Sequence, residues 1–312
     1  MHKIILTMAV FFLFSFVVFN VVAQEKYTLK PRYPQGTYEM KTEMDMDMKI
    51  KIGEQIIPNH QIQSQYQEII AEAVEPDGLQ QVNTELKRIV LKQIINGREM
   101  FFDSAVENTR NSPLKMLGVI VGLKTTITFD QDSKIVKIEG LDEFLEKNSQ
   151  SLPKQVVEQL KKLLSKEVFT KTFDILREAM PQQPVAVGEQ WKSENISEIP
   201  FMGKVKTKQT NTLKEIQSVD GKELAVIVSQ SRMKSDSPQE MNMAAATKMT
   251  LKSTDIDNEN TIQIEIKTGL VVSSTTQIKM NIDLEATVNN QIIQQNMTGN
   301  GKTTMTITRT EK

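Results

Sequence analysis

Apolar and charged residues alternate without interruption between residues 38 and 52, the clearest pattern in this chain. Methionine or isoleucine fills most even positions, and Glu, Asp or Lys fills the odd ones. A period of two predicts a β-strand with one buried face and one wet face. At about 3.3 Å per residue this strand would reach roughly 50 Å, so it must bend or twist. A strand of this kind favours a half-barrel over a flat sheet.

Further strands are predicted wherever similar alternation is bounded by turn residues. A turn at residues 75–78 separates two such segments, and Asn96-Gly97 marks a tight hairpin. We also expect turns around Pro58-Asn59, at residues 257–260 and at residues 299–301. The predicted strands beyond the first are 61–74, 79–95, 98–102, 125–129, 135–138, 205–216, 224–233, 241–256, 261–267, 270–288 and a last one through Met305 and Ile307.

Residues 141–180 change to a helical period. Phe169, Phe173 and Met180 share one face of a predicted helix, and Pro181 ends the segment. We therefore expect a single β-rich domain at 24–312 with a helical insertion at about 141–180. The flanking halves, 37–140 and 185–312, look like a distant internal duplication. The predicted fold is mainly β, a long curved antiparallel sheet or half-barrel with helices over the concave face.

The first 23 residues have the layout of a secretory signal peptide. His2 and Lys3 lead into an apolar run, and small or apolar residues precede a cleavage point between Ala23 and Gln24. This pattern predicts export, with a periplasmic or extracellular mature protein. The apolar run is also close to bilayer-spanning length, so a retained anchor helix is the alternative.

Composition removes several classes of protein. The chain has no cysteine, which excludes an acyl-anchored lipoprotein, disulfides and thiolate chemistry. A net charge of −1 gives no basic excess for nucleic acid. No second apolar segment approaches the length of a membrane span, so we expect a mature protein that does not span a membrane.

Catalytic and metal chemistry find little support in the sequence. After cleavage His60 is the only histidine, and it is expected in a solvated loop. No serine lies in a nucleophile elbow, and a zinc site with several histidines is impossible. Residues 255–260 are rich in Asp, Asn and Glu but lack the glycine and the terminal glutamate of a calcium loop. We therefore predict no enzymatic activity, no catalytic residues, no metal and no cofactor.

Met44, Met46 and Met48 place three thioethers on one face of the first long strand. Thioethers can bind Cu(I), but the stripe continues as isoleucine, which cannot bind a metal. The stripe could equally be ordinary core, or the adaptable wall of an apolar cavity. In the last case Phe169 and Phe173 would be lid residues above Met44, Met46 and Met48. The stripes at residues 40–52 and 278–288 would then face the helices.

The only tryptophan, Trp191, follows the helical segment within Pro184-Val-Ala-Val-Gly188-Glu189-Gln-Trp191. This stretch resembles the G-E-x-W signature of uncharacterised exported β-rich proteins of Bacteroidota. The Ala23-Gln24 junction and the hairpin at residues 267–271 fit the same pattern. More remotely, the architecture is similar to periplasmic lipoprotein-carrier half-barrels. The resemblance implies an exported β-rich fold and carries no established activity.

Two functions remain open. The leading hypothesis is a non-enzymatic carrier or binder of an apolar ligand such as a lipid, sequestered beneath a helical lid. The alternative is an envelope structural or interaction protein with a closed core, acting on protein partners through its surface. A carrier needs an apolar cavity larger than a few waters, whereas a closed core is filled to ordinary packing density.

Overall fold

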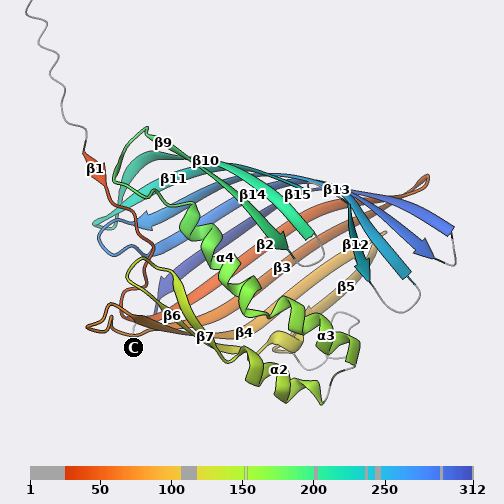
Figure 1. Cartoon of the computed structure of the whole chain (residues 1–312), viewed down its shortest axis with the longest axis horizontal. Coiled ribbons are helices and arrows are strands. Elements are labelled where there is room, and N and C mark those ends of the chain that lie inside the picture. Colours follow the sequence, from red (N-terminus) through yellow and green to blue (C-terminus); the bar gives the residue numbers. More distant parts are fainter. Residues whose placement is uncertain are drawn as a thin grey trace, which may run out of the picture.

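The computed structural model describes residues 25–106, 118–150, 152, 154–199, 203–235, 238–242, 247–288 and 291–310. Residues 1–23, the predicted signal peptide, lie outside the described residues. A 13-stranded antiparallel sheet dominates the described part of the chain, and its three helices run across one face of the sheet (Figure 1). A second, two-stranded sheet joins β1 to β8.

The strands of the first half are β1 (Lys26–Tyr27), β2 (Gly36–Ile52), β3 (Gln55–Ala71), β4 (Gln80–Ile95), β5 (Arg98–Asp103), β6 (Lys124–Phe129) and β7 (Ile135–Glu139). The helices are α2 (Leu141–Ser149), α3 (Lys154–Leu163) and α4 (Lys166–Glu178). The second half contains β8 (Val185–Ala186), β9 (Gln190–Ile199), β10 (Gly203–Val219), β11 (Lys222–Ser235), β12 (Gln239–Asn242), β13 (Thr247–Glu265), β14 (Val271–Val288) and β15 (Gln291–Arg309).

The large sheet consists of two antiparallel meanders joined at its centre. Its main path runs β7-β6-β4-β3-β2-β15-β14-β13-β11-β10-β9, with β5 added beside β4 and β12 beside β13. The joint is the pairing of β2 with β15, which extends from Tyr38↔Arg309 to Ile52↔Gln295. The first long strand and the last strand of the chain are therefore neighbours.

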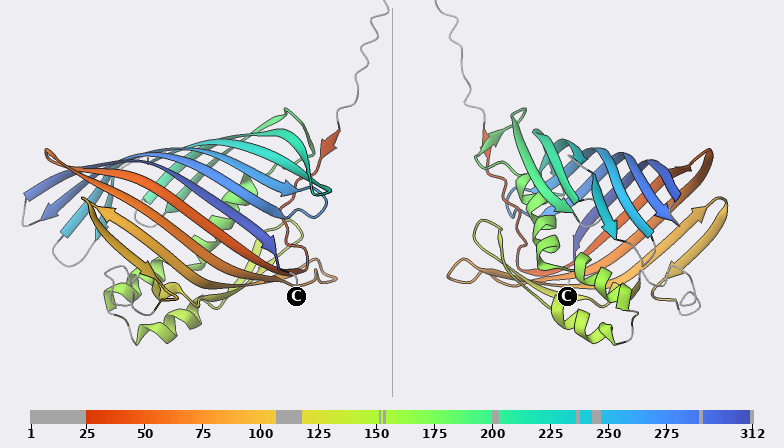
Figure 2. Two further views of the ribbon diagram at one scale, coloured as in Figure 1. Left: turned by 180° about the vertical axis from the view of Figure 1, so that it is seen from behind. Right: turned by 45° about the vertical axis from the view of Figure 1, so that its right-hand side comes forward.

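The sheet twists and curves into an open trough, and the helices lie over its concave face (Figure 2). Such coiling is expected of long twisted strands. The two edges of the main path, β7 and β9, are separate, so the sheet is not closed. This arrangement confirms the predicted fold class. The helices also coincide with the predicted helical insertion.

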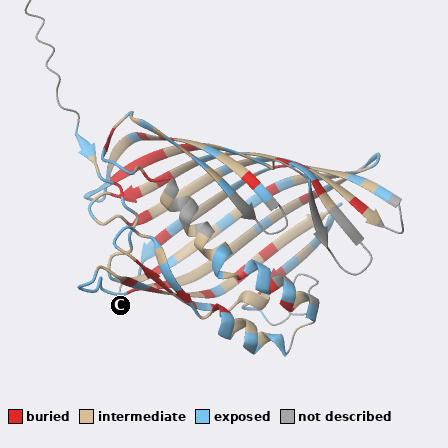
Figure 3. Cartoon of the chain, viewed as in Figure 1, coloured by how far each residue is buried: buried red, intermediate tan, exposed pale blue. Residues whose placement is uncertain are grey.

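Alternation along each strand separates a polar outer face from the concave face. In β2, Tyr38 and Met46 are buried, whereas Asp45 and Asp47 between and beyond them are exposed. Two clusters of buried side chains pack between the concave face and the segments over it. One gathers around Tyr38 and Ile127 with the helices, and the other around Leu213 and Ile262. Figure 3 shows buried residues gathering toward the end of the sheet that carries the C-terminus.

A glycine at the start of α2 allows the helices to approach the sheet. Gly140 has φ 92°, a left-handed conformation that L side chains rarely adopt. A Cβ atom placed there would lie 2.2 Å from the carbonyl oxygen of Lys124 on β6. Only glycine fits this close contact, after which Leu141 enters the core with 1% of its surface exposed.

Three expected turns prove to be strand, which corrects the prediction from sequence. Residues 257–260 lie inside β13, residues 299–301 lie inside β15, and Pro58-Asn59 lies inside β3. Each segment has a paired strand on both sides, so the ladders hold residues that would form turns in isolation. Pro58 lacks an N–H, but its carbonyl still accepts the N–H of Asn96 at 2.9 Å.

Within the described part of the chain, none of the helices has both the length and the apolar character needed to cross a bilayer.

Candidate functional site

A cavity of about 340 Å³ lies between the concave face of the sheet and α4. This volume falls within the range of small-molecule sites, about 300–1,000 Å³. Most of the lining is apolar and comes from several strands and the helix. The principal apolar side chains are Met40, Ile69, Phe129, Phe173, Met305 and Ile307.

Strand alternation and one helical residue explain this lining. Met40 on β2 pairs with Ile307 on β15, so both side chains point to the concave face. From the other side Phe173 of α4 reaches down, and its ring meets Phe129 edge to face, with centroids 5.8 Å apart and planes at 67°. This geometry is favourable for aromatic pairs, so it anchors α4 above the cavity.

One side of the cavity is closed by residues 29–34, which we name the N-terminal strap. Hydrogen bonds from three different parts of the sheet hold its backbone. Ser133 Oγ donates to the carbonyl of Pro31, and Gln80 Nε2 donates to that of Tyr33, each at 2.6 Å. The N–H of Arg32 donates to Gly269 O at 2.9 Å. The strap is therefore fixed by these polar contacts and by its own apolar side chains, since Leu29 is only 2% exposed and Tyr33 packs against the buried cluster around Tyr38.

Polar groups at the cavity include several from the strap and from the hairpin between β6 and β7. Arg32 lines the cavity and donates from Nη2 to Gln131 O at 2.6 Å, with no ion pair to another described residue. Asp130 also lines it, and its Oδ1 accepts the backbone N–H groups of Asp132 and Lys134 at 2.8 and 2.9 Å. Burial raises the pKa of the Tyr33 phenol to about 12, because the charged phenolate is poorly solvated there.

The residues proposed from sequence occupy different positions relative to this cavity. Phe173 lines it, and Phe169 packs in the neighbouring buried cluster. Met44, Met46 and Met48 lie on the same concave face but farther along β2, outside the lining. Sequence reasoning missed Met40, Met305, Ile307 and the N-terminal strap. Met40 is the first residue of the apolar stripe predicted from the sequence. Among the missed lining residues, it is therefore the one that the sequence pattern could have identified.

The distal methionines pack over glycines of the neighbouring strand. Met46 is opposite Gly301, and a Cβ on that glycine would lie 3.2 Å from Met46 Cε. Gly299 has the same relation to Met48 and Met280, at 3.1 and 3.3 Å from their Cγ atoms. These contacts explain why glycines stand inside a strand at this point. Among the described residues no group of three or more His, Asp or Glu side chains could hold a metal ion.

A second hollow, of about 700 Å³, lies on the polar outer face of the sheet. His60 lines it from β3, where it follows Pro58-Asn59 within the strand and not in the solvated loop expected from sequence. Its Nδ1 lies 2.7 Å from Asp47 Oδ1 on β2. Charged side chains such as Lys279 and Asp255 line it together with apolar residues, among them Met48, Met280 and Ile94.

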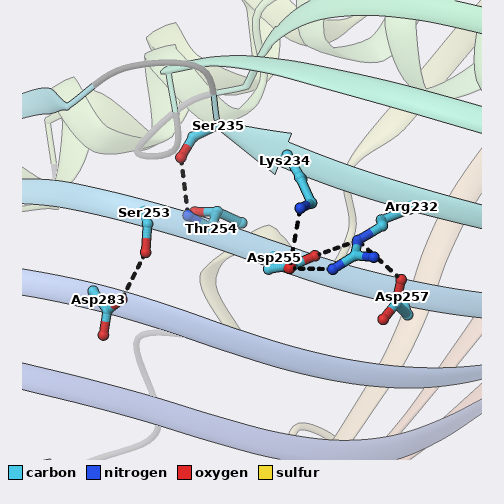
Figure 4. A network of polar contacts seen from close by, with 8 residues as sticks. All are labelled: Arg232, Lys234, Ser235, Ser253, Thr254, Asp255, Asp257 and Asp283. Atoms are coloured by element: carbon cyan, nitrogen blue, oxygen red, sulfur yellow. Dashed lines mark hydrogen bonds and ion pairs between the residues drawn. The ribbon is translucent and has the colours of Figure 1, made fainter.

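Two acidic residues at this hollow, Asp255 and Asp257, are already paired with cations (Figure 4). Arg232 binds Asp255 through Nε at 2.8 Å and Nη2 at 2.5 Å, and Lys234 Nζ lies 3.5 Å from the same carboxylate. The hydrogen bonds from Arg232 lower the pKa of Asp255. Arg232 Nε also lies 3.5 Å from Asp257. These cross-strand ion pairs account for the Asp-rich composition of the segment without a calcium ion.

The Gly188-Glu189-Gln-Trp191 segment has a structural role. Gly188 turns the chain with φ 87°, and Glu189 Oε2 accepts the N–H of Ala186 at 2.9 Å. That backbone hydrogen bond lowers the pKa of Glu189. Trp191 then donates from Nε1 to Ala179 O at 3.1 Å, which ties the end of α4 to β9. The motif thus fixes one end of the helix that covers the cavity.

Fold and site together define a class of protein, an open antiparallel half-barrel with helices over its concave face and an apolar cavity beneath them. The chain belongs to DUF6263, a family of unknown function, whose model matches residues 77–271. The matched region begins just before β4 and ends at the start of β14, so it includes α2, α3 and α4. No curated protein matches the sequence.

Solved structures show only distant similarity. Lipovitellin, described for its lipid–protein interactions, has a TM-score of 0.45 and 10% identity over 90% of this chain. The chain spans 26% of the lipovitellin chain. An outer membrane channel from Pseudomonas putida F1 has a TM-score of 0.29 and 4% identity, covering 89% of this chain and 97% of that one. The translocator domain of the autotransporter NalP from Neisseria meningitidis has a TM-score of 0.21 and 6% identity, covering 87% and 89%. These scores are too low to support a functional argument.

Proposed function

We propose that this protein is an exported, non-enzymatic binder or carrier of an apolar ligand such as a lipid. The observation that carries the proposal is the cavity of about 340 Å³ between the sheet and α4. Protein interiors normally contain few voids larger than a water molecule, whose share of liquid volume is about 30 Å³. A void of this size, lined by apolar side chains, has the character of a small-molecule site.

The mechanism would be sequestration without covalent chemistry. An apolar chain in contact with Met40, Met305 and Phe173 would leave water and gain about 25 cal/mol per Å² of buried apolar surface. α4 and the N-terminal strap would border the bound chain, because both segments line the cavity. Methionine side chains adapt to varied apolar shapes, which suits a site that accepts more than one chain length.

Native mass spectrometry of the mature protein, purified from its native envelope without detergent, tests this proposal. We expect a reproducible extra mass that denaturation releases. A clean apo mass, together with no uptake of added dodecanol, would contradict the proposal. That result would favour an envelope protein that acts through its surface.

A matched pair of variants ties binding to the cavity. Met305→Trp fills the cavity and should abolish dodecanol uptake. Met297→Trp introduces the same side chain on the same strand and face but outside the lining, so uptake should persist. Equal uptake by both variants would place the ligand elsewhere.

A further inference from the structure

Positive charge at the cavity exceeds negative charge. Among the described residues that line it, Arg32 and Arg177 are cationic, and Asp130 is the one carboxylate. One oxygen of Asp130 already accepts two backbone N–H groups, which disperses part of its charge. Arg177 lies four residues after Phe173 on α4, so both side chains share the helix face that covers the cavity.

The cavity combines an apolar interior with charged groups at one side. This combination would complement an amphiphilic ligand. Met40, Met305 and Ile307 offer an apolar surface on the sheet. Arg32 belongs to the strap, where its guanidinium is exposed and has donors beyond the one used for Gln131 O. Within the described part of the chain the hydroxyl of Tyr33, beside Arg32, makes no hydrogen bond, so it can also donate to a ligand.

We propose that the cavity takes a single-chain amphiphile with an anionic headgroup, whose oxygens are bound by Arg32 at the strap. This inference rests on the proposed function, because it identifies the ligand class of the same cavity. A guanidinium binds carboxylate and phosphate oxygens through paired N–H donors, so both headgroups share the required chemistry. A volume of about 340 Å³ corresponds to about eleven water molecules, which suits a chain of about twelve carbons.

Three ligands with the same twelve-carbon chain distinguish the proposed function, binding of an apolar chain, from the inference of an anionic headgroup. Dodecanol, dodecanoate and dodecyl phosphate are titrated into the mature protein at pH 7 and low ionic strength by isothermal calorimetry. Charge-assisted hydrogen bonds should make at least one anion bind about tenfold more tightly than dodecanol. The preferred anion identifies a carboxylate or a phosphate headgroup. Equal affinity for all three would overturn the headgroup inference and leave the apolar cavity intact, whereas no binding of any probe would overturn the proposed function.

Arg32→Gln tests the assigned residue. It should weaken the affinity for the preferred anion about tenfold more than the affinity for dodecanol. Arg98→Gln removes an exposed arginine from the β4–β5 hairpin and should change neither affinity. The dodecanol titration also reports whether the strap remains in place after loss of the hydrogen bond to Gln131. An anion preference that survives Arg32→Gln would contradict the assignment.

Discussion

Gly269 shows how one residue can hold the strap that closes the cavity. It adopts φ +77°, and a Cβ there would lie 2.2 Å from Lys30 O in the strap. We expect Gly269→Ala to lower the free energy of unfolding by about 2–4 kcal/mol, because it adds a backbone clash to the cost of the left-handed conformation. Urea denaturation measures this change.

Gly221→Ala is the matched control for the clash. Gly221 has φ +74°, almost the same conformation, but nothing lies within 4 Å of a Cβ built there. Its replacement should cost only about 1 kcal/mol, the conformational term. Similar losses in the two variants would show that the contact with Lys30 contributes nothing.

The ion pair between Arg88 and Asp103 predicts a pH dependence. Arg88 Nε and Nη2 donate to the two oxygens of Asp103 at 2.9 and 2.5 Å, and this pairing lowers the pKa of Asp103. Only 4% of Asp103 is exposed. Because folding lowers this pKa, the pair stabilises the protein fully above about pH 4 and loses its contribution as the pH falls through the lowered value.

Asp103→Asn should therefore lower the free energy of unfolding at pH 7 by about 1–3 kcal/mol. The difference from the wild type should shrink as the pH falls below about 4 and through the lowered pKa of Asp103, because the wild-type carboxyl then becomes protonated. Asp132→Asn removes an exposed ion pair with Lys30 and should cost less than about 1 kcal/mol. A pH-independent difference for Asp103→Asn would contradict the charge-based explanation.

At the level of single residues, the sequence predicted part of the candidate site. Helical spacing placed Phe169 and Phe173 on one face, and Phe173 does line the cavity. Strand alternation put Met40 and Met46 on one face, but it could not show which of the two lies under α4. That choice depends on the register between β2 and β15 and on where the helices cross, and neither is encoded by the period of a single strand.

The strands themselves were largely predictable as elements, because alternation marks a half-buried strand wherever it persists. The failures at residues 257–260 and 299–301 have a common cause. Asn258 pairs with Ser231 on one side and Ile278 on the other, so both ladders hold it extended. Gly299 and Gly301 stand in β15 where methionine side chains occupy the adjacent space. Turn propensity is a local property, and here the neighbouring strands outweigh it.

The helices and the central strands should differ in local stability. β2, β14 and β15 have hydrogen-bonded neighbours on both sides over most of their length. α4 contacts the sheet through apolar side chains such as Phe173, whose ring meets that of Phe129. Hydrogen–deuterium exchange should therefore be slowest in these strands and faster in α2, α3 and α4.

Bound dodecanol should slow exchange selectively in α4 and the N-terminal strap, because these segments cover the cavity. The distal half of β2, which lies outside the lining, serves as the internal control. Protection confined to the outer-face hollow around His60 would instead indicate that the ligand binds there.

For the whole molecule, the half-barrel could be predicted, but the strand pair that joins its two halves could not. Strand length and helix position indicated a curved sheet with helices inside. The period of two says nothing about which strands pair, however, so the partnership of β2 with β15 came only from the structure. This pairing joins the two meanders and gives the fold many contacts between residues far apart in sequence, a topology associated with slow folding.

The central position of β15 leads to a prediction for truncation. Removal of residues 291–312 would leave β2 and β14 as long unpaired edges and would separate the two meanders. It would also remove Ile307 and Met305 from the cavity lining. We expect this variant to lose cooperative unfolding and to aggregate, because exposed flat edges pair readily with other chains. Circular dichroism during urea denaturation and light scattering would detect both effects.

Removal of residues 311–312 alone leaves β15 whole and should preserve the wild-type transition. A cooperative transition in the longer truncation would instead show that the two meanders fold independently and that the β2–β15 ladder only docks them together.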